Sequence, residues 1–234
     1  MNIGVIPARG GSRRITNKNI KPFAGKPIMG RVIETALASK VFDRLVVSTD
    51  DQAIADVALT YGAEVPFLRP ATLADDHTGI IEVIQHAVTW MRSEQLAVEY
   101  VCCLLATAPF LKADILSSAL TQLRQSDAAY AFSVTEFPFP IQRAIRFNPT
   151  GRVEAIWPEN IQRRSQDLEA AYHDAGQFYW GRVEAFENAV PIFSNESIPV
   201  RLPRYLVQDI DTSDDWILAE LQFNALVDSG ELPG

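Results

Sequence analysis

The stretch IPARGGSRRITNKN, Ile6–Asn19, follows a short apolar run that begins at Ile3, and it combines two glycines with four basic side chains. The apolar run predicts a short buried strand, and the rest predicts the loop that follows it. Gly10 and Gly11 allow backbone N–H groups of this loop to approach an anion closely. The stretch therefore predicts a strand that leads into an anion-binding loop.

Charge is distributed unevenly along the chain. The net charge is −8, yet residues 1–33 contain no Asp or Glu, and all 29 acids lie beyond them. A basic segment of this kind can simply be a solvated face, and this alternative remains open for the charges taken alone. An acidic protein with one basic patch is a poor general nucleic-acid binder. The pattern favours one small polyanion held at a focused site.

Composition and cysteine usage limit the classes of protein to which this chain can belong. Hydrophobic residues make up 47% of the 234 residues and charged residues 21%, as in ordinary globular proteins. No apolar run reaches the roughly 18 residues of a membrane span, and the N-terminus does not resemble a signal peptide. Cys102 and Cys103 are adjacent, so they cannot join distant elements. We expect a cytoplasmic chain with reduced thiols and without a membrane or nucleic-acid partner.

Apolar strands alternate with amphipathic helices over about the first 130 residues. Strands are predicted at 3–6, 44–50, 64–67 and 99–106, and helices at 27–39, 51–62, 78–95 and 114–125. This alternation predicts a mostly parallel sheet with helices on both faces. Such sheets bind ligands at the carboxyl ends of their strands. The loop after Ile6, the turn at Asp50 and the turn at 107–109 all lie at those ends.

The pattern changes after residue 130. Strands are predicted at 129–137, at 175–181 and within 199–211, with a hairpin at 143–157 that turns at 148–151. A last helix is predicted at 213–227, where Thr212 and Asp215 resemble a capping box. We therefore expect a single α/β domain over residues 1–234, with an arm at about 137–170.

Two carboxylates alternate with one apolar residue near the end of the chain, in VQDIDTSDDW. On an extended segment Asp209 and Asp211 point the same way. Two carboxylates on one side can hold a hard divalent ion such as Mg²⁺. Alternatively, they only lead into the following helix, whose N-terminus favours acids.

Hydrogen-bonding side chains gather in RRSQDLEAAYHDAGQFYWG, residues 163–181. This set suits a polyhydroxylated carboxylic acid, with arginine for the carboxylate and amides or hydroxyls for the sugar. The candidate residues are Arg164, Gln166, Tyr172, His173, Gln177 and Tyr179. A wet surface loop followed by a core strand is the alternative, and His173 is equally suited to a structural hydrogen bond.

Common nucleotide and catalytic motifs are missing from the sequence. It contains no GxxxxGK[ST], no GxGxxG and no GxSxG, and its cysteines and histidines lack metal-ligand spacing. The residues alone therefore leave the class of nucleotide open.

Several stretches together resemble the CMP-sialic acid synthetase family, the cytidylyltransferases that activate acidic sugars. The opening signature IPARGGSRRITNKNIKPFAGKP is the most specific of them, and the resemblance extends over nearly the whole chain. The other stretches are STDD, RPATLADD, ATAPF, RSQD, YHDAGQFYWG and QDIDT. The resemblance implies a Rossmann-like nucleotide-diphospho-sugar transferase fold. It also implies a homodimer in which the arm helps to close the partner's sugar pocket.

The resemblance assigns roles to individual residues. Arg9, Arg13, Lys18 and Asp211 would be catalytic, and Mg²⁺ would bind Asp209 and Asp211. The nucleotide would contact Ala8, Arg9, Gly10, Gly11, Ser12, Lys18, Asn19, Arg69 and Ala106. Arg13 stands where a lysine is usual, and Thr16 replaces a common proline. Ala106 stands where sialic acid enzymes often carry glutamine, which favours pseudaminic acid as the sugar.

The implied reaction joins CTP to a nine-carbon acidic 2-keto sugar, releasing pyrophosphate. The product would serve surface glycan or flagellin glycosylation. Sialic, legionaminic and Kdo-type acids remain alternative acceptors, and a catalytically silent nucleotide-binding regulator is an alternative of another class.

Overall fold

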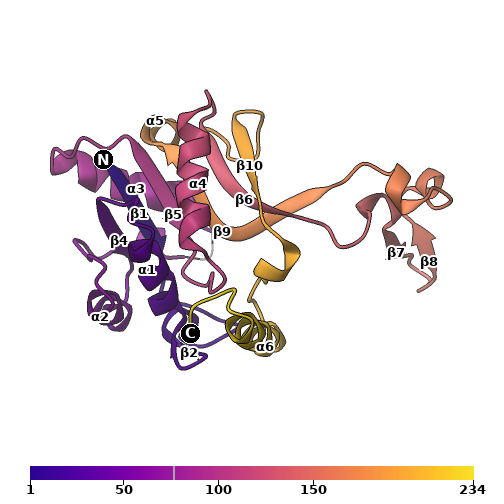
Figure 1. Ribbon diagram of the computed structural model, residues 1–234, viewed down its shortest axis with the longest axis horizontal. Helices are drawn as coiled ribbons and strands as arrows, with labels where there is room; N and C mark the ends of the chain where they lie inside the picture. The colour runs from indigo at the N-terminus through magenta and orange to yellow at the C-terminus, as the bar shows by residue number, and fades with distance from the viewer. Residues whose placement is uncertain (76) are drawn as a thin grey trace.

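A six-stranded mixed sheet forms the centre of the computed structural model, which describes residues 1–75 and 77–234 (Figure 1). Asp76, the last residue of RPATLADD, lies outside the described residues. The strand order is β10-β6-β9-β5-β1-β4. The bounds are β1 Asn2–Pro7, β4 Arg44–Ser48, β5 Tyr100–Leu104, β6 Tyr130–Glu136, β9 Tyr172–Arg182 and β10 Ser197–Arg201. β1 pairs in parallel with β4 and β5, and β10 with β6, whereas β9 is antiparallel to both neighbours. The predicted mostly parallel sheet is confirmed.

Helices cover both faces of this sheet, as the alternation predicts. The helix bounds are α1 Ile28–Ala38, α2 Gln52–Thr60, α3 Ile80–Ser93, α4 Ala113–Arg124, α5 Val183–Glu187 and α6 Ser213–Asp228. Buried residues of α1, α2 and α4 form one core with one side of the strands, and those of α3 and α5 form a second core with the other. Among the described residues, none of the helices has both the length and the apolar character needed to cross a membrane.

Side-chain alternation along β5 separates the two cysteines. Cys102 belongs to the first core and Cys103 to the second, and both are free and buried. Burial raises the pKa of both thiols. The cysteines are therefore core residues and poor nucleophiles.

Two predicted strands differ from the structure. The segment predicted at 64–67 makes an isolated bridge from Glu64 to Val46, and the following residue, Leu68, makes another to Thr49. Pro66 within it lacks a backbone N–H donor, which explains why a continuous ladder does not form. The strand predicted within 199–211 ends at Arg201, two residues before another proline. The chain then continues through a 3₁₀ turn, η6 Arg204–Leu206, and an irregular segment.

The arm leaves the sheet between β6 and β9 and projects away from the body of the molecule (Figure 1). It contains the antiparallel pair β7 Ile145–Phe147 and β8 Val153–Ala155, so the predicted hairpin is confirmed. The carboxamide of Asn148 accepts hydrogen bonds from the turn, and Gly151 has a φ of 75°. Three 3₁₀ turns complete the arm: η3 Ile141–Arg143, η4 Pro158–Asn160 and η5 Ser165–Asp167.

A third apolar cluster joins the beginning of the chain to its end. It brings together Ile15, Phe23, Ile28, Phe110, Leu206, Ile210, Trp216, Ala219, Phe223, Leu226 and Leu232. Phe23 belongs to the small hairpin formed by β2 Pro22–Phe23 and β3 Lys26–Pro27, and its ring makes edge contacts with Trp216 and Phe223 at 5.4 Å. The predicted capping box of Thr212 and Asp215 starts α6. The cluster therefore fixes the C-terminal segment against the opening loop.

We predict that Ile210→Ala destabilises the protein by about 2–5 kcal/mol, because it leaves a cavity in this third cluster. Ile217→Ala is the matched control, since Ile217 is 57% exposed on α6, and it should change stability by about 0.5 kcal/mol or less. Denaturant unfolding followed by circular dichroism measures both. Equal stabilities of the two variants would show that the cluster does not hold the segment.

Candidate active site

The backbone of the opening loop lies close to the carboxyl end of β4. The N–H of Gly10 donates to Oδ1 of Asp50 at 3.0 Å. A Cβ added to Gly10 would lie 2.7 Å from Oδ2 of Asp51, so this close approach requires glycine. An added Cβ on Gly11 would meet no atom of the described residues within 4 Å. One side of the loop is therefore fixed to the protein, and the other is open to a ligand.

Four cationic side chains of the loop line one cavity of about 230 Å³, here called the loop cavity. Its walls are Pro7, Arg9, Ser12, Arg13, Arg14, Ile15, Lys18, Asn19, Leu105, Ala106, Thr107 and Asp211. Most of the predicted nucleotide residues and one predicted metal ligand thus lie together. Ala8 is an exception, because its side chain is buried and its N–H donates to the Ser48 carbonyl at 2.9 Å.

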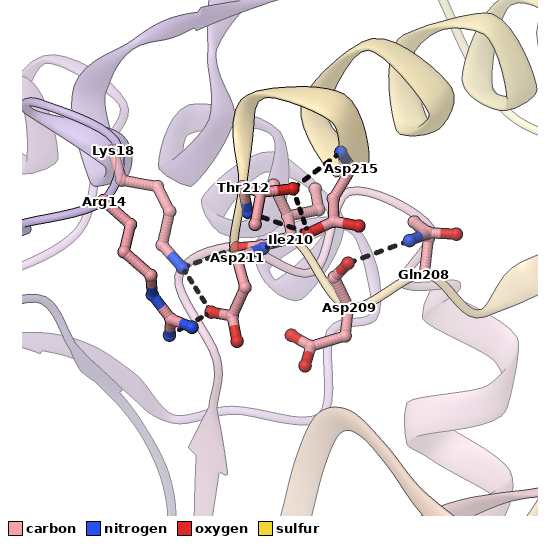
Figure 2. A network of polar contacts seen from close by, with 8 residues as sticks. All are labelled: Arg14, Lys18, Gln208, Asp209, Ile210, Asp211, Thr212 and Asp215. Carbon is pink, nitrogen blue, oxygen red and sulfur yellow. Dashed lines mark hydrogen bonds and ion pairs between the residues drawn. The ribbon is translucent and has the colours of Figure 1, made fainter. Parts of the chain in front are cut away.

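The alternation predicted for residues 209–211 is present in the structure. Ile210 is buried in the third cluster, and the carboxylates of Asp209 and Asp211 project from the same side of the segment (Figure 2). Burial of the middle residue thus turns both acids away from the core.

Cations of the opening loop reach this segment. Lys18 Nζ donates to the carbonyl of Ile210 at 2.6 Å and lies 3.6 Å from Oδ1 of Asp211. Arg14 Nη2 lies 2.7 Å from the same oxygen (Figure 2). The loop and the acidic segment are therefore joined by charge as well as by apolar contact.

Asp209 lies in a different environment from Asp211. It lines a separate cavity of about 740 Å³ at the base of the arm, here called the arm-base cavity, together with His173 and other residues. Burial raises the pKa of Asp209, and the charge of Asp211 raises it further, whereas Lys18 opposes both effects. The two carboxylates therefore repel each other, and a bound cation would relieve this repulsion.

Side chains rather than a β-ladder hold both ends of the irregular segment 207–211, which contains Asp209 and Asp211. At one end the carboxylate of Asp215 accepts from the N–H groups of Asp211 and Thr212, at 3.1 and 2.7 Å. The hydroxyl and backbone bonds from Thr212 lower the pKa of Asp215. At the other end the buried amide of Gln177 donates to the Leu206 carbonyl. Gln177 thus anchors the segment, whereas the sequence placed it among the sugar-binding candidates.

Arg69 lines another cavity, of about 240 Å³, which shares Pro7 and Arg9 with the loop cavity. Its side chain is 3% exposed, and Nη2 lies 3.8 Å from Oδ1 of Asp50. Nε and Nη2 are buried without a hydrogen-bond partner in the part of the chain that the structure describes. Burial lowers the pKa of this guanidinium, and the Asp50 charge opposes that shift. The Arg69 cavity therefore presents buried donors to a ligand with acceptor atoms.

Tyr179 lines a fourth cavity, of about 540 Å³, on the side of the sheet covered by α3 and α5. The other walls are Gly79, Ile80, Ile81, Glu82, Gln85, Ala189, Pro191, Ile192 and Phe193. Gly79 and Ile80 also line the Arg69 cavity, so the two spaces adjoin. The Tyr179 hydroxyl donates to Oδ2 of Asp174. Burial raises the pKa of Tyr179, as does the Asp174 charge. The hydroxyl can therefore only accept a further hydrogen bond from a ligand.

The other sugar-binding candidates do not share this cavity within one chain. Tyr172 is 38% exposed with the Arg201 guanidinium 4.8 Å from its ring, and His173 lines the arm-base cavity. Arg164 and Gln166 are exposed on the arm. Phe178 and Trp180 lie in the opposite core from Tyr179, because side chains alternate along β9.

The sequence did not assign a role to three contributors to the site. Asp50 accepts from the loop backbone and lies near Arg69, and its position at the end of a predicted strand was the available signal. Arg14 was counted only as charge, although it pairs with Asp211. Asp174 orients Tyr179 and also accepts from Gly176 N–H at 2.9 Å, where the strand has a φ of 63°. Only the fold reveals the last two contacts.

Comparisons with known proteins place these features in a family. The family model described as Cytidylyltransferase matches residues 3–224. A pseudaminic acid cytidylyltransferase of Campylobacter jejuni is 45% identical over 222 residues, which are 95% of this chain and 96% of that protein. A CMP-N,N'-diacetyllegionaminic acid synthase of Legionella pneumophila is 31% identical over 225 residues, 93% of this chain and 94% of that protein.

A solved structure shares the fold. The CMP:2-keto-3-deoxy-manno-octonic acid synthetase complexed with CTP superposes with a TM-score of 0.67 at 17% identity, covering 98% of this chain and 99% of that one. The expected Rossmann-like architecture is therefore confirmed. With the family model and the relatives above, this shows that the chain belongs to the cytidylyltransferase family of nucleotidyltransferases.

Proposed function

We propose that this chain transfers CMP from CTP to the C2 hydroxyl of pseudaminic acid, a nine-carbon acidic 2-keto sugar, and releases pyrophosphate. The observation that carries the proposal is the loop cavity, where four cations of a glycine-containing loop face Asp211. The 45% identity to a pseudaminic acid cytidylyltransferase supports this choice of acceptor.

The loop cavity suits a triphosphate that must be held in line with an attacking hydroxyl. The sugar hydroxyl attacks the α-phosphorus, and pyrophosphate leaves from the opposite side. Arg9, Arg13 and Lys18 bind the phosphates and neutralise the charge that develops as the bond to pyrophosphate breaks. The protein contributes position and charge, so this chemistry requires no covalent intermediate.

Asp209 and Asp211 are the residues that would hold Mg²⁺. They fit this ion because their carboxylates project from the same side of the segment and repel each other electrostatically. The described residues contain no cluster of three or more acidic, histidine or cysteine ligands, in keeping with the habit of Mg²⁺ to combine few carboxylates with phosphate oxygens and water. When bound, Mg²⁺ polarises the phosphoryl group and lowers the pKa of a coordinated hydroxyl.

The Arg69 cavity suits the cytosine base. Cytosine presents a carbonyl oxygen and a ring nitrogen, both acceptors, on one edge, and the buried donors of Arg69 complement them. The shared Pro7 and Arg9 place this cavity beside the loop cavity, so base and phosphates can belong to one nucleotide.

The Tyr179 cavity suits an apolar substituent of the sugar with a nearby N–H. Ile192 and Phe193 supply apolar walls, and the Tyr179 hydroxyl is left to accept because it donates to Asp174. Acylamido groups carry an N–H donor and a methyl group, as this arrangement requires. Ala106 gives the loop cavity a small apolar wall at this one position, where its side chain offers no hydrogen bond to the additional hydroxyl of sialic acid.

The arm supports a homodimer. It exposes a group of large apolar side chains, with exposed fractions of 79% at Phe139, 77% at Phe147, 60% at Val153 and 57% at Ile145. Such a concentration is typical of a surface that a partner covers. An arm packed on a second copy would bring Arg164 and Gln166 to the partner's sugar site, and both lie exposed on the arm of a single chain.

Replacement of a proposed metal ligand should abolish most activity without unfolding the protein. Asp211→Asn is expected to reduce turnover by about 10²-fold or more, the scale of losing one major electrostatic contributor. Asp214→Asn, an exposed acid in the first turn of α6, is the control and should retain activity. Pyrophosphate release with CTP and Mg²⁺ measures the rates. Full turnover of folded Asp211→Asn, or of the wild type in EDTA, would remove the metal from the proposal.

The choice of acceptor is tested by the same pyrophosphate assay with a panel of acidic sugars. We expect a higher kcat/KM for pseudaminic acid than for N-acetylneuraminic, legionaminic or Kdo-type acids, with modest activity on sialic acid. A hydrophobic pocket discriminates against an added hydroxyl by only about 10²-fold. Ala106→Gln should lower the ratio of kcat/KM for pseudaminic acid to kcat/KM for N-acetylneuraminic acid, because it favours the more polar sugar. A preference for N-acetylneuraminic acid would overturn the acceptor alone, whereas CTP binding without pyrophosphate release from any sugar would indicate a silent relative.

The dimer is tested by sedimentation. The wild type should have twice the 26.0 kDa mass of the chain, and Phe139→Ser combined with Phe147→Ser should shift it toward the monomer because the apolar contact is lost. Leu221→Ser is the matched control, since Leu221 is 64% exposed on α6 rather than on the arm. A monomeric wild type, or a double variant that stays dimeric, would contradict this assignment.

A further inference from the structure

Two loop cations neutralise Asp211, but they are held very differently (Figure 2). Lys18 has a side chain that is 21% exposed, and its ammonium is fixed by the Ile210 carbonyl at 2.6 Å. Arg14 is 66% exposed and reaches Oδ1 of Asp211 at 2.7 Å. Among the described residues Asp211 is its one ion-pair partner within 4 Å, and its charge also acts on the nearby Asp215. Lys18 is therefore a fixed part of the site, whereas Arg14 is held by a single exposed contact.

The Arg14 contact is easily exchanged. Exposed ion pairs contribute little net stability, because water screens them and two long side chains lose freedom to form them. A guanidinium can donate two parallel hydrogen bonds to a pair of oxygens. Carboxylates and phosphates both present such a pair of acceptors. Arg14 already lines the loop cavity, so it can reach a phosphate there by a change of side-chain torsions.

The position of Arg14 conflicts with a cation on the same carboxylate. A divalent ion bound to Oδ1 of Asp211 would lie close to the guanidinium that now contacts this oxygen at 2.7 Å. Like charges at such a distance repel strongly in a partly buried site. Binding of the ion at this oxygen therefore requires Arg14 to move, and a nucleotide phosphate bound in the loop cavity could receive it.

We propose that Arg14 is an exchangeable counter-ion, which neutralises Asp211 until the substrate binds and then transfers to a nucleotide phosphate as the divalent cation takes its place. This inference rests on the proposed function, in which Asp211 binds the cation and the loop cavity binds the triphosphate. The nucleotide draws Arg14 away from Asp211 and so favours the cation. By linkage the cation favours the nucleotide to the same extent.

The exchange predicts opposite effects of one substitution on two affinities. Arg14→Gln should bind Mn²⁺ about 2- to 5-fold more tightly in the absence of nucleotide, because an exposed competing ion pair has been removed. The same variant should bind CTP about 10-fold more weakly in EDTA, because a charge-assisted contact to phosphate has been lost. Electron paramagnetic resonance of free Mn²⁺ measures the first affinity, and titration calorimetry measures the second.

Two further variants make the result interpretable. Lys21→Gln removes a charge whose ammonium lies 4.3 Å from the Trp216 ring centroid instead of on Asp211, and it should change either affinity by less than about 2-fold. Asp211→Asn should weaken Mn²⁺ binding in the wild-type background. Circular dichroism confirms folding, which an exposed position such as Arg14 should not disturb.

An Arg14→Gln variant with unchanged or weaker Mn²⁺ binding would overturn the exchange, and so would unchanged CTP binding in EDTA. A pair that only braces the loop would move both affinities in the same direction. If Asp211→Asn binds Mn²⁺ as well as the wild type does, the proposed metal site itself fails. Loss of Mn²⁺ binding in Asp211→Asn without an effect of Arg14→Gln would leave the site in place and remove only the exchange.

Discussion

Burial of Ile210 is the constraint on which the rest of the site depends. This side chain packs into the third apolar cluster beside Ile15 of the opening loop, so the end of the chain is fixed against its beginning. Because neighbouring side chains of an extended segment point in opposite directions, burying Ile210 turns Asp209 and Asp211 outward. The outward arrangement of the two carboxylates is thus a by-product of hydrophobic packing, reinforced by Lys18, which donates to the Ile210 carbonyl.

A second constraint on the site is the balance between its cations and the acceptors around them. Four cations close together would repel one another, and the protein places acceptors among them. Asp50 binds the loop backbone and lies near Arg69, the Asp75 carbonyl accepts from Arg9, and Asp211 pairs with Arg14 and Lys18. The donors are therefore held in position for a polyanion, which lowers the reorganisation that catalysis would otherwise require. Exposed pairs in this network can be exchanged, whereas buried ones fix the geometry.

The predicted sugar-binding residues are arranged differently from the predicted nucleotide-binding residues. Alternation along β9 places Tyr179 on one face of the sheet and Phe178 on the other, so one strand cannot line a pocket with all its aromatic residues. The remaining polar candidates lie at the base of the arm or on the arm itself. One chain thus brings most of the predicted nucleotide residues together, whereas the predicted sugar residues are divided, as the proposed homodimer would require.

The sequence alone determined the features that depend on local pattern. The strand and basic loop at Ile6–Asn19, the parallel sheet, the arm hairpin and the outward pair of carboxylates all follow from periodicity, turn residues and charge read over short stretches. Tertiary structure decided what depends on contacts between distant residues. It made Gln177 an anchor of Leu206 rather than a wall of the sugar pocket, and it placed Arg14 on Asp211. It also reduced the strand predicted at 64–67 to isolated bridges at the sheet edge. The reason is physical: alternation and helical periodicity are properties of neighbouring residues, whereas the partner of a buried amide or an exposed arginine is set only when the cores have packed.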